Sequence, residues 1–373
     1  MKKVLFVATV VRMHINVFHT PYLKWFQEHG WDTTVAARND YENPDDCIIP
    51  YCNHYVEIPF ERNPFKKNNL KAFSELKKLI DEEEFDLIYC HTPVGAMITR
   101  LAAVSARNKG SKVVYMAHGF HFFKGAPLSN WLIYYPVERV LARLTDMILT
   151  INNEDYCAAQ KFHIKNVEIV PGVGIDLSRF TPSSEKKEEL RNNFEIDNSQ
   201  FVIMSVGELS DRKNQIVILQ AMARLKNPDI TYVICGDGSN RELLENTAKE
   251  LGISKQLKLL GFRHDVNELY NVADAFVFPS LQEGLPVSVM EAMAMKLPVI
   301  ASKIRGSEDL VDTRKGGFLI EKNSINKYAQ AIDYMYKHRD KLGKIGFYNQ
   351  KKVQQYSIDA VVSVIMEKIL KIV

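Results

Sequence analysis

Short apolar runs alternate with amphipathic helical patterns along the whole chain. This alternation is typical of βαβ units, in which helices connect the parallel strands of one sheet. In the first half it predicts strands at Val4–Thr9, Thr33–Ala37, Leu87–Cys90, Val113–Ala117, Met147–Ile151 and Val167–Val170. A second series comprises Phe201–Val206, Tyr232–Cys235, Lys258–Leu260, Ala275–Phe278 and Pro298–Ala301. The pattern therefore predicts an α/β protein with two parallel sheets.

A polar stretch separates the two series. Pro171–Asn198 is rich in proline, glycine, serine and charge, which favours a connection between domains. We therefore expect one domain at residues 1–178 and another at 199–350. The remaining residues, 351–373, contain a helix with an apolar stripe formed by Ile358, Val361, Val362, Ile365, Ile369 and Leu370. That stripe must pack on something, either back on the first domain or within the second.

Composition agrees with a globular enzyme of two domains. The chain has 373 residues, of which 46% are hydrophobic and 25% charged, and its net charge of +3 is spread evenly. No basic face suggests nucleic-acid binding. Five scattered cysteines without a C-x-x-C pair fit a reducing compartment. The opening apolar run, Val4 to Val11, is short for a signal peptide, and no stretch is long enough to span a bilayer. We expect a cytoplasmic protein that is either free or peripheral on the inner face of the plasma membrane.

The most specific motif is "PSLQEGLPVSVMEAMAMKLPVIAS", residues 279–302. Glu283 and Gly284 follow a predicted strand, and a helix is expected to begin at Pro286, where a missing N–H costs nothing. The free amides and positive end of such a helix suit a phosphate group. Glu291 lies about two turns further on. Two carboxylates at this spacing can bracket one ligand, and an acid near a parallel-sheet crevice commonly binds ribose hydroxyls.

A second motif follows the strand Phe201–Val206. Gly207 turns the chain, Asp211 is expected to cap a helix, and Arg212 and Lys213 would lie in its first turn. Cations there oppose the helix dipole, which makes sense if a bound anion compensates. Two further pairs, Ser239 with Glu242 and Asp265 with Glu268, have the spacing of helix capping boxes.

The first of these motifs resembles that of the family-4 retaining glycosyltransferases of GT-B fold, whose Glu-x7-Glu pattern is matched by Glu283 and Glu291. The resemblance implies two Rossmann-like domains whose parallel sheets face each other across an interdomain cleft. The first domain would bind the acceptor and the second the nucleotide sugar. It also implies that Glu291 holds the ribose, that Glu283 lies beside the donor sugar and that Lys213 contacts the diphosphate. Glu208 stands where the family has an arginine. Either Arg212 replaces that arginine, or Glu208 contacts the acceptor.

The resemblance assigns further residues. Leu285-Pro286 replaces the usual Phe-Gly, which removes one backbone donor to the sugar. The expected catalytic residues are His118, Glu283 and Lys213. The expected donor site comprises Gly207, Arg212, Lys213, Phe262, Arg263, Glu283, Gly284, Leu285 and Glu291, with the nucleobase near Phe262 and Arg263. The expected acceptor side comprises Arg12, His14, Asn16 and His121.

The segments "VATVVRMHINVFHTPYLKWF" and "AHGFHFFKGAP" are similar to enzymes of capsular or exopolysaccharide assembly. The resemblance implies a metal-independent hexosyltransferase or N-acetylhexosaminyltransferase. Its donor would be a UDP-sugar, without other cofactors, and its acceptor a polyprenyl-diphosphate-linked saccharide. A sugar-nucleotide epimerase of the same architecture and a non-catalytic assembly module stay open as alternatives. A nicotinamide dehydrogenase is disfavoured because no G-x-G-x-x-G follows the first strand. A metal hydrolase using His14, His91 and His118 lacks paired ligand spacing, so no metal site is expected.

One basic segment favours contact with an anionic membrane. Residues 59–79, "PFERNPFKKNNLKAFSELKKL", place lysines among three phenylalanines, a composition that suits an interfacial helix. The lysines are Lys66, Lys67, Lys71, Lys77 and Lys78, and the phenylalanines are Phe60, Phe65 and Phe73. The alternative is a solvated helix that packs its phenylalanines inward.

Overall fold

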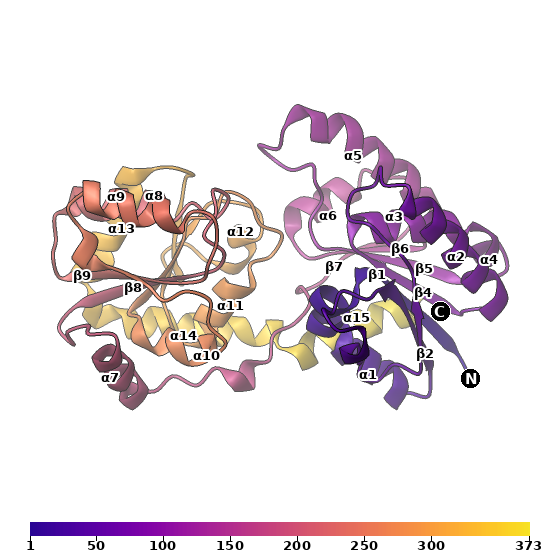
Figure 1. The fold of residues 1–373 in the computed structure, drawn as a ribbon, viewed down its shortest axis with the longest axis horizontal. Coiled ribbons are helices and arrows are strands. Elements are labelled where there is room, and N and C mark those ends of the chain that lie inside the picture. Colours follow the sequence, from indigo (N-terminus) through magenta and orange to yellow (C-terminus); the bar gives the residue numbers. More distant parts are fainter. The chain divides into compact units, whose positions relative to one another are not determined.

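The computed structural model describes all 373 residues, which form two compact units (Figure 1). Unit 1 comprises Met1–Gly174 together with Ile358–Val373, and unit 2 comprises Ile175–Ser357. Each unit is built around one parallel sheet with helices packed on its two faces.

The sheet of unit 1 has seven parallel strands in the order β3-β2-β1-β4-β5-β6-β7. They are β1 (Lys3–Val10), β2 (Asp32–Arg38), β3 (His54–Glu57), β4 (Leu87–His91), β5 (Lys112–Ala117), β6 (Met147–Thr150) and β7 (Val167–Ile169). The longer helices are η1 (Val11–His19), α1 (Thr20–Glu28), α2 (Asn68–Glu83), α3 (Pro93–Ala102), α4 (Val104–Asn108), α5 (Leu128–Leu141), α6 (Asn153–Ala159) and α15 (Ile358–Leu370). The strand order reverses direction at β1, so β1 and β4 flank the topological switch point, where such sheets bind ligands.

Unit 2 repeats this plan with six strands in the order β10-β9-β8-β11-β12-β13. They are β8 (Phe201–Val206), β9 (Ile230–Cys235), β10 (Leu257–Leu259), β11 (Ala275–Phe278), β12 (Val299–Ser302) and β13 (Gly317–Ile320). The helices are α7 (Ser184–Asn193), α8 (Ile216–Leu225), α9 (Arg241–Glu250), α10 (Val266–Leu269), α11 (Val287–Ala294), α12 (Ser307–Leu310), α13 (Ile325–Lys337) and α14 (Leu342–Val353). Its switch point lies between β8 and β11.

Every strand predicted from the sequence is present, and the α/β class with two parallel sheets is confirmed. The pattern works because strands buried on both faces are apolar without interruption. All six residues of β9 are buried, for example. The structure adds two edge strands that were not predicted, β3 and β13. β3 is short and largely exposed, so it carries little apolar signal.

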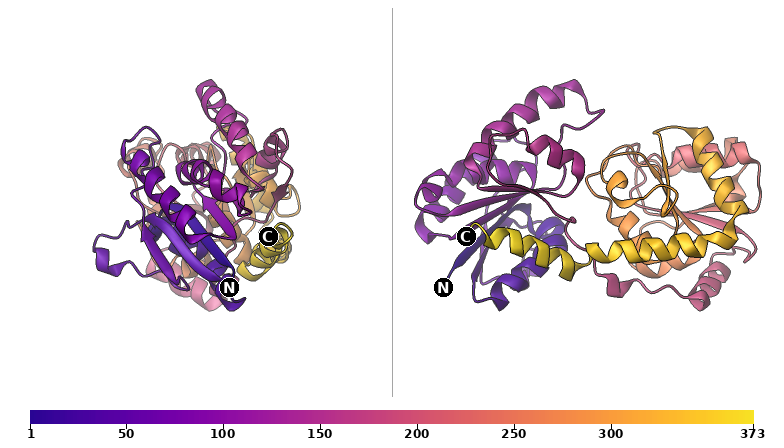
Figure 2. Two further views of the ribbon diagram at one scale, coloured as in Figure 1. Left: turned by 90° about the vertical axis from the view of Figure 1, so that its right-hand side faces the viewer. Right: turned by 180° about the vertical axis from the view of Figure 1, so that it is seen from behind.

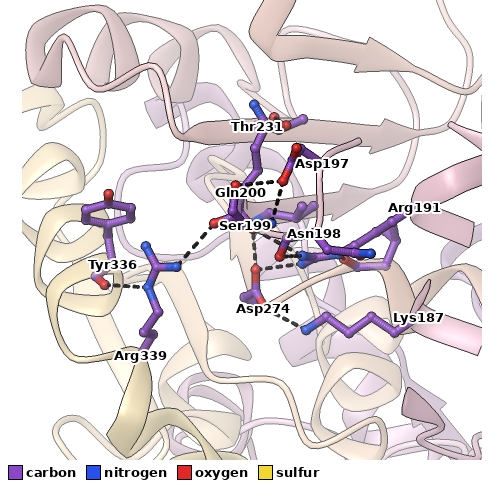
Figure 3. A network of polar contacts seen from close by, with 12 residues as sticks. Lys187, Arg191, Asp197, Asn198, Ser199, Gln200, Thr231, Asp274, Tyr336 and Arg339 are labelled. Carbon is purple, nitrogen blue, oxygen red and sulfur yellow. Dashed lines mark hydrogen bonds and ion pairs between the residues drawn. The ribbon is translucent and has the colours of Figure 1, made fainter. Parts of the chain in front are cut away.

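The polar stretch between the two strand series contains a helix, α7, that the pattern did not predict. The Arg191 guanidinium, whose side chain is 3% exposed, donates to the Asp274 carboxylate at 2.8 Å and to three backbone carbonyls (Figure 3). Lys187 donates to the same carboxylate at 2.6 Å. Asp274 also accepts from the backbone N–H of Val202 at 2.7 Å. This network ties α7 to the beginning of the unit 2 sheet.

The C-terminal helix α15 is part of unit 1, where it packs beside α1 (Figure 2). Its buried side chains are Val361, Val362, Ile365, Met366 and Ile369. Leu370 of the expected stripe is 46% exposed, because Met366 turns inward instead. At Gly174, which has φ +85°, a Cβ atom would lie 2.8 Å from Cα of Ile358. The first segment of unit 1 therefore ends in direct contact with the residue that begins α15.

Candidate functional site

The loops that follow β8 and β11 bring two cations and a carboxylate together at the switch point of unit 2. Oε1 of Glu283 accepts hydrogen bonds from Nζ of Lys213 at 2.7 Å and from Nη1 of Arg212 at 2.8 Å. Oγ of Ser280 donates to the same oxygen at 2.7 Å. One carboxylate oxygen thus sets the positions of both cations that the sequence assigned to a diphosphate.

Lys213 is a largely sheltered cation. Its side chain is 15% exposed, and that of Glu283 13%, whereas Arg212 is 43% exposed. Nζ of Lys213 lies 5.0 Å from the centroid of the Phe278 ring, a cation–π contact. At Gly207, with φ +144°, a Cβ would come within 3.3 Å of Cε of Lys213, so glycine leaves room for the lysine stem. Charges sheltered from water interact more strongly with a bound anion.

The two cations do not lie in a helix, as the sequence had suggested. Helix α8 begins at Ile216, and Asn214 has φ +55°, a conformation that interrupts a right-handed helix. Asp211 does not cap α8, since its carboxylate accepts from Nδ2 of Asn240 at 2.8 Å. The expectation that Arg212 and Lys213 oppose a helix dipole is therefore wrong. Glu283 balances the positive charge of these two residues instead.

The backbone around Glu283 is fixed by a neighbouring loop. Nε of Arg305 donates to the Glu283 carbonyl at 2.9 Å. A Cβ on Gly306 would lie 2.3 Å from the Gly284 carbonyl oxygen, so only glycine permits this approach. Leu285 packs against the core of unit 2. Helix α11 begins at Val287 with Pro286 as its N-cap, one residue later than expected.

Glu291 lies within α11 and has a partner of its own. The Tyr270 hydroxyl donates to Oε2 of Glu291 at 2.8 Å. Burial raises the pKa of the Glu291 carboxyl, and the Tyr270 hydroxyl and the Arg179 charge oppose that shift. The structure thus joins Glu283 to Lys213 and Arg212, whereas Glu291 is held separately.

The residues expected near the nucleobase follow β10. Phe262 is 70% exposed. The Arg263 guanidinium donates to both oxygens of Asp265, at 2.9 and 2.6 Å, which lowers the pKa of that carboxyl. An exposed ring beside a bound guanidinium offers a flat surface on which a base can stack.

Neither capping box forms. Helix α9 begins at Arg241 with Asn240 as its N-cap, which leaves Ser239 one position too early. Asp265 is the N-cap of α10, but its side chain makes no capping hydrogen bond because Arg263 occupies both oxygens.

Unit 1 contains a cavity of about 490 Å³ next to α5. Its lining is mainly apolar and includes Val10, Met13, Phe65, Met97, Tyr115, Phe122, Ile133 and Val137. Arg62 also lines it, and Glu138 does so while paired with the buried Arg100 at 2.8 Å. An apolar cavity with few polar groups is typical of a binding site for a small or lipid-like molecule.

The predicted acceptor residues take different positions around this cavity. His14 and His121 line it, and the His121 ring stacks on Tyr134 with centroids 4.5 Å apart. Arg12 is exposed at the surface. Nδ2 of Asn16 donates to the Tyr41 hydroxyl at 2.7 Å, so this side chain anchors a loop.

Several residues at these sites were not singled out from the sequence. Ser280 and Arg305 hold Glu283, Tyr270 donates to Glu291, and Arg62 lines the cavity of unit 1. Ser280 was detectable in principle, because it lies three residues before Glu283. Arg305 and Arg62 reach their sites only through the fold, and no local spacing marks them.

The prediction that the phenylalanines of residues 59–79 face a membrane is wrong for two of the three. Phe60 is fully buried and Phe73 packs on the core of unit 1, so only Phe65 is exposed. Helix α5 carries more exposed aliphatic side chains than any other helix; they are Leu128, Leu132, Ile133, Val137 and Val140. None of the helices combines the length and apolarity that crossing a bilayer requires.

Two sheets of Rossmann-like strand order in one chain, with paired cations at the second switch point, define a glycosyltransferase of the GT-B class. Comparison with known proteins agrees with this class. Residues 186–352 match the family described as "Glycosyl transferases group 1", and residues 3–152 match "Glycosyl transferase 4-like". The chain belongs to this family of glycosyltransferases, which confirms the resemblance seen in the sequence.

Several relatives cover most of the chain. The "Putative glycosyltransferase EpsD" of Bacillus subtilis (strain 168) is 38% identical over 361 residues, 95% of this chain and 93% of that protein. The "UDP-Gal:alpha-D-GlcNAc-diphosphoundecaprenol alpha-1,3-galactosyltransferase" of Escherichia coli is 31% identical over 283 residues, 73% of this chain and 71% of that protein. The crystal structure of Anabaena Alr3699/HepE in complex with UDP and glucose has a TM-score of 0.82 at 20% identity, covering 100% of both chains. This likeness confirms the GT-B fold.

Proposed function

We propose that this glycosyltransferase transfers a sugar from a UDP-sugar to a polyprenyl-diphosphate-linked saccharide during assembly of a surface polysaccharide. Retention of the anomeric configuration follows from the family resemblance. Unit 2 would bind the donor and unit 1 the acceptor.

The contact of Lys213 and Arg212 with Glu283 carries the donor assignment. A leaving diphosphate develops negative charge as the glycosidic bond breaks, and preorganised cations stabilise it. Lys213 fits this role because it is sheltered and already oriented at 2.7 Å from Glu283. Arg212 contacts the same oxygen and therefore takes the place of the missing family arginine. In this proposal the chain's own cations bind the diphosphate, and no metal ion is needed there.

The remaining donor contacts follow the family motif. The Glu291 carboxylate would accept the ribose hydroxyls, with Tyr270 orienting it. Phe262 and Arg263 would lie beside the base. Printed names of relatives support a uridine nucleotide, since one E. coli relative uses UDP-Gal and the HepE structure contains UDP.

The acceptor assignment is supported by the cavity of unit 1. Its apolar lining suits a polyprenyl chain, and Arg62 is a cation for the diphosphate. The name of the E. coli relative specifies an acceptor of this chemistry. The exposed aliphatic face of α5 borders the same cavity through Ile133 and Val137. We propose that this face meets the inner surface of the plasma membrane, where the acceptor resides.

The test of transfer uses the full chain with a panel of UDP-sugars and a short polyprenyl-diphosphate GlcNAc acceptor. Mass spectrometry of the lipid product is expected to show one added sugar, and NMR an unchanged anomeric configuration. Glu283→Gln serves as the matched inactive variant. A new sugar isomer in the absence of acceptor would identify an epimerase. UDP binding without turnover on any acceptor would identify a non-catalytic module.

Vesicle co-sedimentation tests the membrane face. Replacing Leu132 and Val140 on α5 by glutamine should weaken binding to anionic vesicles, because the exposed aliphatic area is lost. Leu70→Gln is the control, since Leu70 is 76% exposed on α2. Equal loss in the control, or no vesicle binding by the wild type, would contradict the assignment of α5.

A further inference from the structure

Four histidines from three separate segments converge at the switch point of unit 1. His14 and His19 belong to η1, His91 ends β4, and His118 follows β5. One nitrogen of each imidazole lies within 4.8 Å of a nitrogen of every other. His19 and His91 are fully buried, whereas His14 and His118 are partly exposed above them.

The backbone conformation of η1 places its two histidines on the same side of the helix. Residues five apart on an α-helix point about 140° away from each other, so an α-helix would separate His14 and His19. Residues 11–19 instead form a π-helix, in which i→i+5 hydrogen bonds place such residues on nearly the same face. π-helical turns are rare and occur mostly at functional sites. The unusual backbone thus serves to aim both imidazoles at His91 and His118.

The imidazole nitrogens of this cluster lack hydrogen-bond partners in the protein. Both nitrogens of His19 and of His91 are buried without one, as is Nε2 of His14 and of His118. Each such unpaired group costs roughly 1–3 kcal/mol, so a protein rarely gathers several of them at one point. A shared metal ion that accepts one lone pair from each ring removes this cost at one nitrogen of each histidine, and the second nitrogens of His19 and His91 stay unpaired.

Burial opposes protonation of all four rings. Burial, together with the charge of Arg62, lowers the pKa of His14 to about 4, and burial lowers the pKa of His118 to about 3. Burial also lowers the pKa of His19 and of His91.

The ring spacing suits tetrahedral coordination. With Zn–N bonds of about 2.0–2.1 Å, imidazole centroids around a tetrahedral ion lie about 5 Å apart. The observed centroid distance from His14 is 4.9 Å to His19 and 5.0 Å to His118, and His91 and His118 are 5.7 Å apart. The His19–His118 and His14–His91 distances are longer, at 5.9 and 6.1 Å, so these rings would move closer around an ion. The His19 and His91 rings are closer, at 3.8 Å, and these two would separate by about 1 Å around an ion.

We propose that His14, His19, His91 and His118 bind one divalent transition-metal ion of the zinc class. The all-imidazole ligand set favours zinc, cobalt, nickel or copper over calcium and magnesium, which prefer oxygen. Four protein ligands close a tetrahedral site, which is the arrangement of structural zinc. The ion fastens η1 to the ends of β4 and β5. This site lies in unit 1, apart from Lys213 and Glu283 of unit 2. The proposal makes His118 a metal ligand instead of the catalytic residue expected from the sequence, and it replaces the expectation that the chain has no metal site.

The experiment measures metal binding by the purified full chain, so it does not depend on transferase activity. The protein is stripped with dipicolinate and titrated with Co²⁺, and Zn²⁺ is then added in competition. We expect one equivalent of Co²⁺ with the intense visible absorption of a tetrahedral complex, displaced by one equivalent of Zn²⁺. Zn²⁺ should also raise the thermal unfolding temperature.

Two variants make the result specific. His14→Gln alters a partly exposed ligand and should fold, yet it should weaken Co²⁺ affinity more than about 100-fold, beyond the usual effect of an outer-shell change. His29→Gln is the control, because its ring stacks on Trp25 outside the cluster, and it should bind as the wild type does. Absence of stoichiometric binding, an octahedral spectrum, or equal affinity in the two variants would overturn the proposal.

Discussion

Replacing Lys213 by alanine removes the more sheltered of the two cations that contact Glu283. Oε1 of Glu283 then keeps Arg212 at 2.8 Å and Ser280 at 2.7 Å, so the carboxylate is not left without donors. The change therefore tests the role of one charge without exposing its partner as an unpaired buried group.

The expected cost to the activation barrier is somewhat larger than the expected cost to stability. Loss of a preorganised group that stabilises transition-state charge costs about 2.7–4 kcal/mol, or roughly 10²–10³-fold in kcat. Loss of one hydrogen bond to a charged group costs about 1.5–3 kcal/mol of folding free energy at most. Because the leaving diphosphate gains charge only as the bond breaks, kcat should fall more than the affinity for UDP-sugar.

The assay is the initial rate of UDP release at saturating donor and acceptor, with urea unfolding measured on the same samples. Lys187→Ala is the matched control, because Lys187 forms a comparable 2.6 Å ion pair with Asp274 away from the donor loops. That variant should lose similar stability and keep its rate. If kcat of the Lys213 variant stays within about threefold of the control, Lys213 does not stabilise the leaving group.

Three further predictions concern the donor site and the fold. Glu291→Ala should weaken UDP binding in calorimetry by about 1–3 kcal/mol, through loss of the ribose acceptor, and Tyr270→Phe should weaken it less; unchanged affinity in the alanine variant would remove Glu291 from the site. Transfer should persist when EDTA is added to the assay, because the chain supplies the cations for the diphosphate, and a loss that magnesium or manganese reverses would refute this. A loss that only zinc or cobalt reverses would point to the histidines of unit 1. Arg191→Ala should destabilise unit 2 by about 1–3 kcal/mol in urea, since the carbonyls that Arg191 bonds lose their donor while Lys187 still pairs with Asp274; a wild-type midpoint would mean that α7 contributes little.

The strands were predictable because they are buried on both faces, which leaves an apolar signal that no other element mimics at that length. β3 was not predicted because most of its residues are exposed at a sheet edge. α7 was not predicted because its sequence, "SEKKEELRNN", is almost entirely polar. Its buried residues are only Leu190 and Arg191, and the pairing of Arg191 and Lys187 with Asp274 fixes the helix instead of an apolar stripe.

The proposed donor residues Glu283 and Glu291 could be singled out from a local motif, since they lie on one short segment. The positions of the cations that pair with Glu283 were harder to predict from the sequence. Whether Arg212 and Lys213 sit in a helix depended on the backbone of Asn214, whose positive φ no spacing rule indicates. Three members of the histidine cluster, His14, His91 and His118, were considered together as metal ligands and set aside because their spacing shows no paired ligands. His19 was not singled out, because it meets His14 only on a π-helix.

The inclusion of α15 in unit 1 has a consequence for synthesis on the ribosome. Unit 2 is one continuous segment, Ile175–Ser357, and can fold as soon as it emerges. Unit 1 lacks its last helix throughout that time, which is about 10–40 s at roughly 5–20 residues per second. Until then the surface of α1 that α15 covers stays open to water and to chaperones. The first domain to be translated is thus the last to be completed, and a nascent chain that stalls before residue 358 leaves it unfinished.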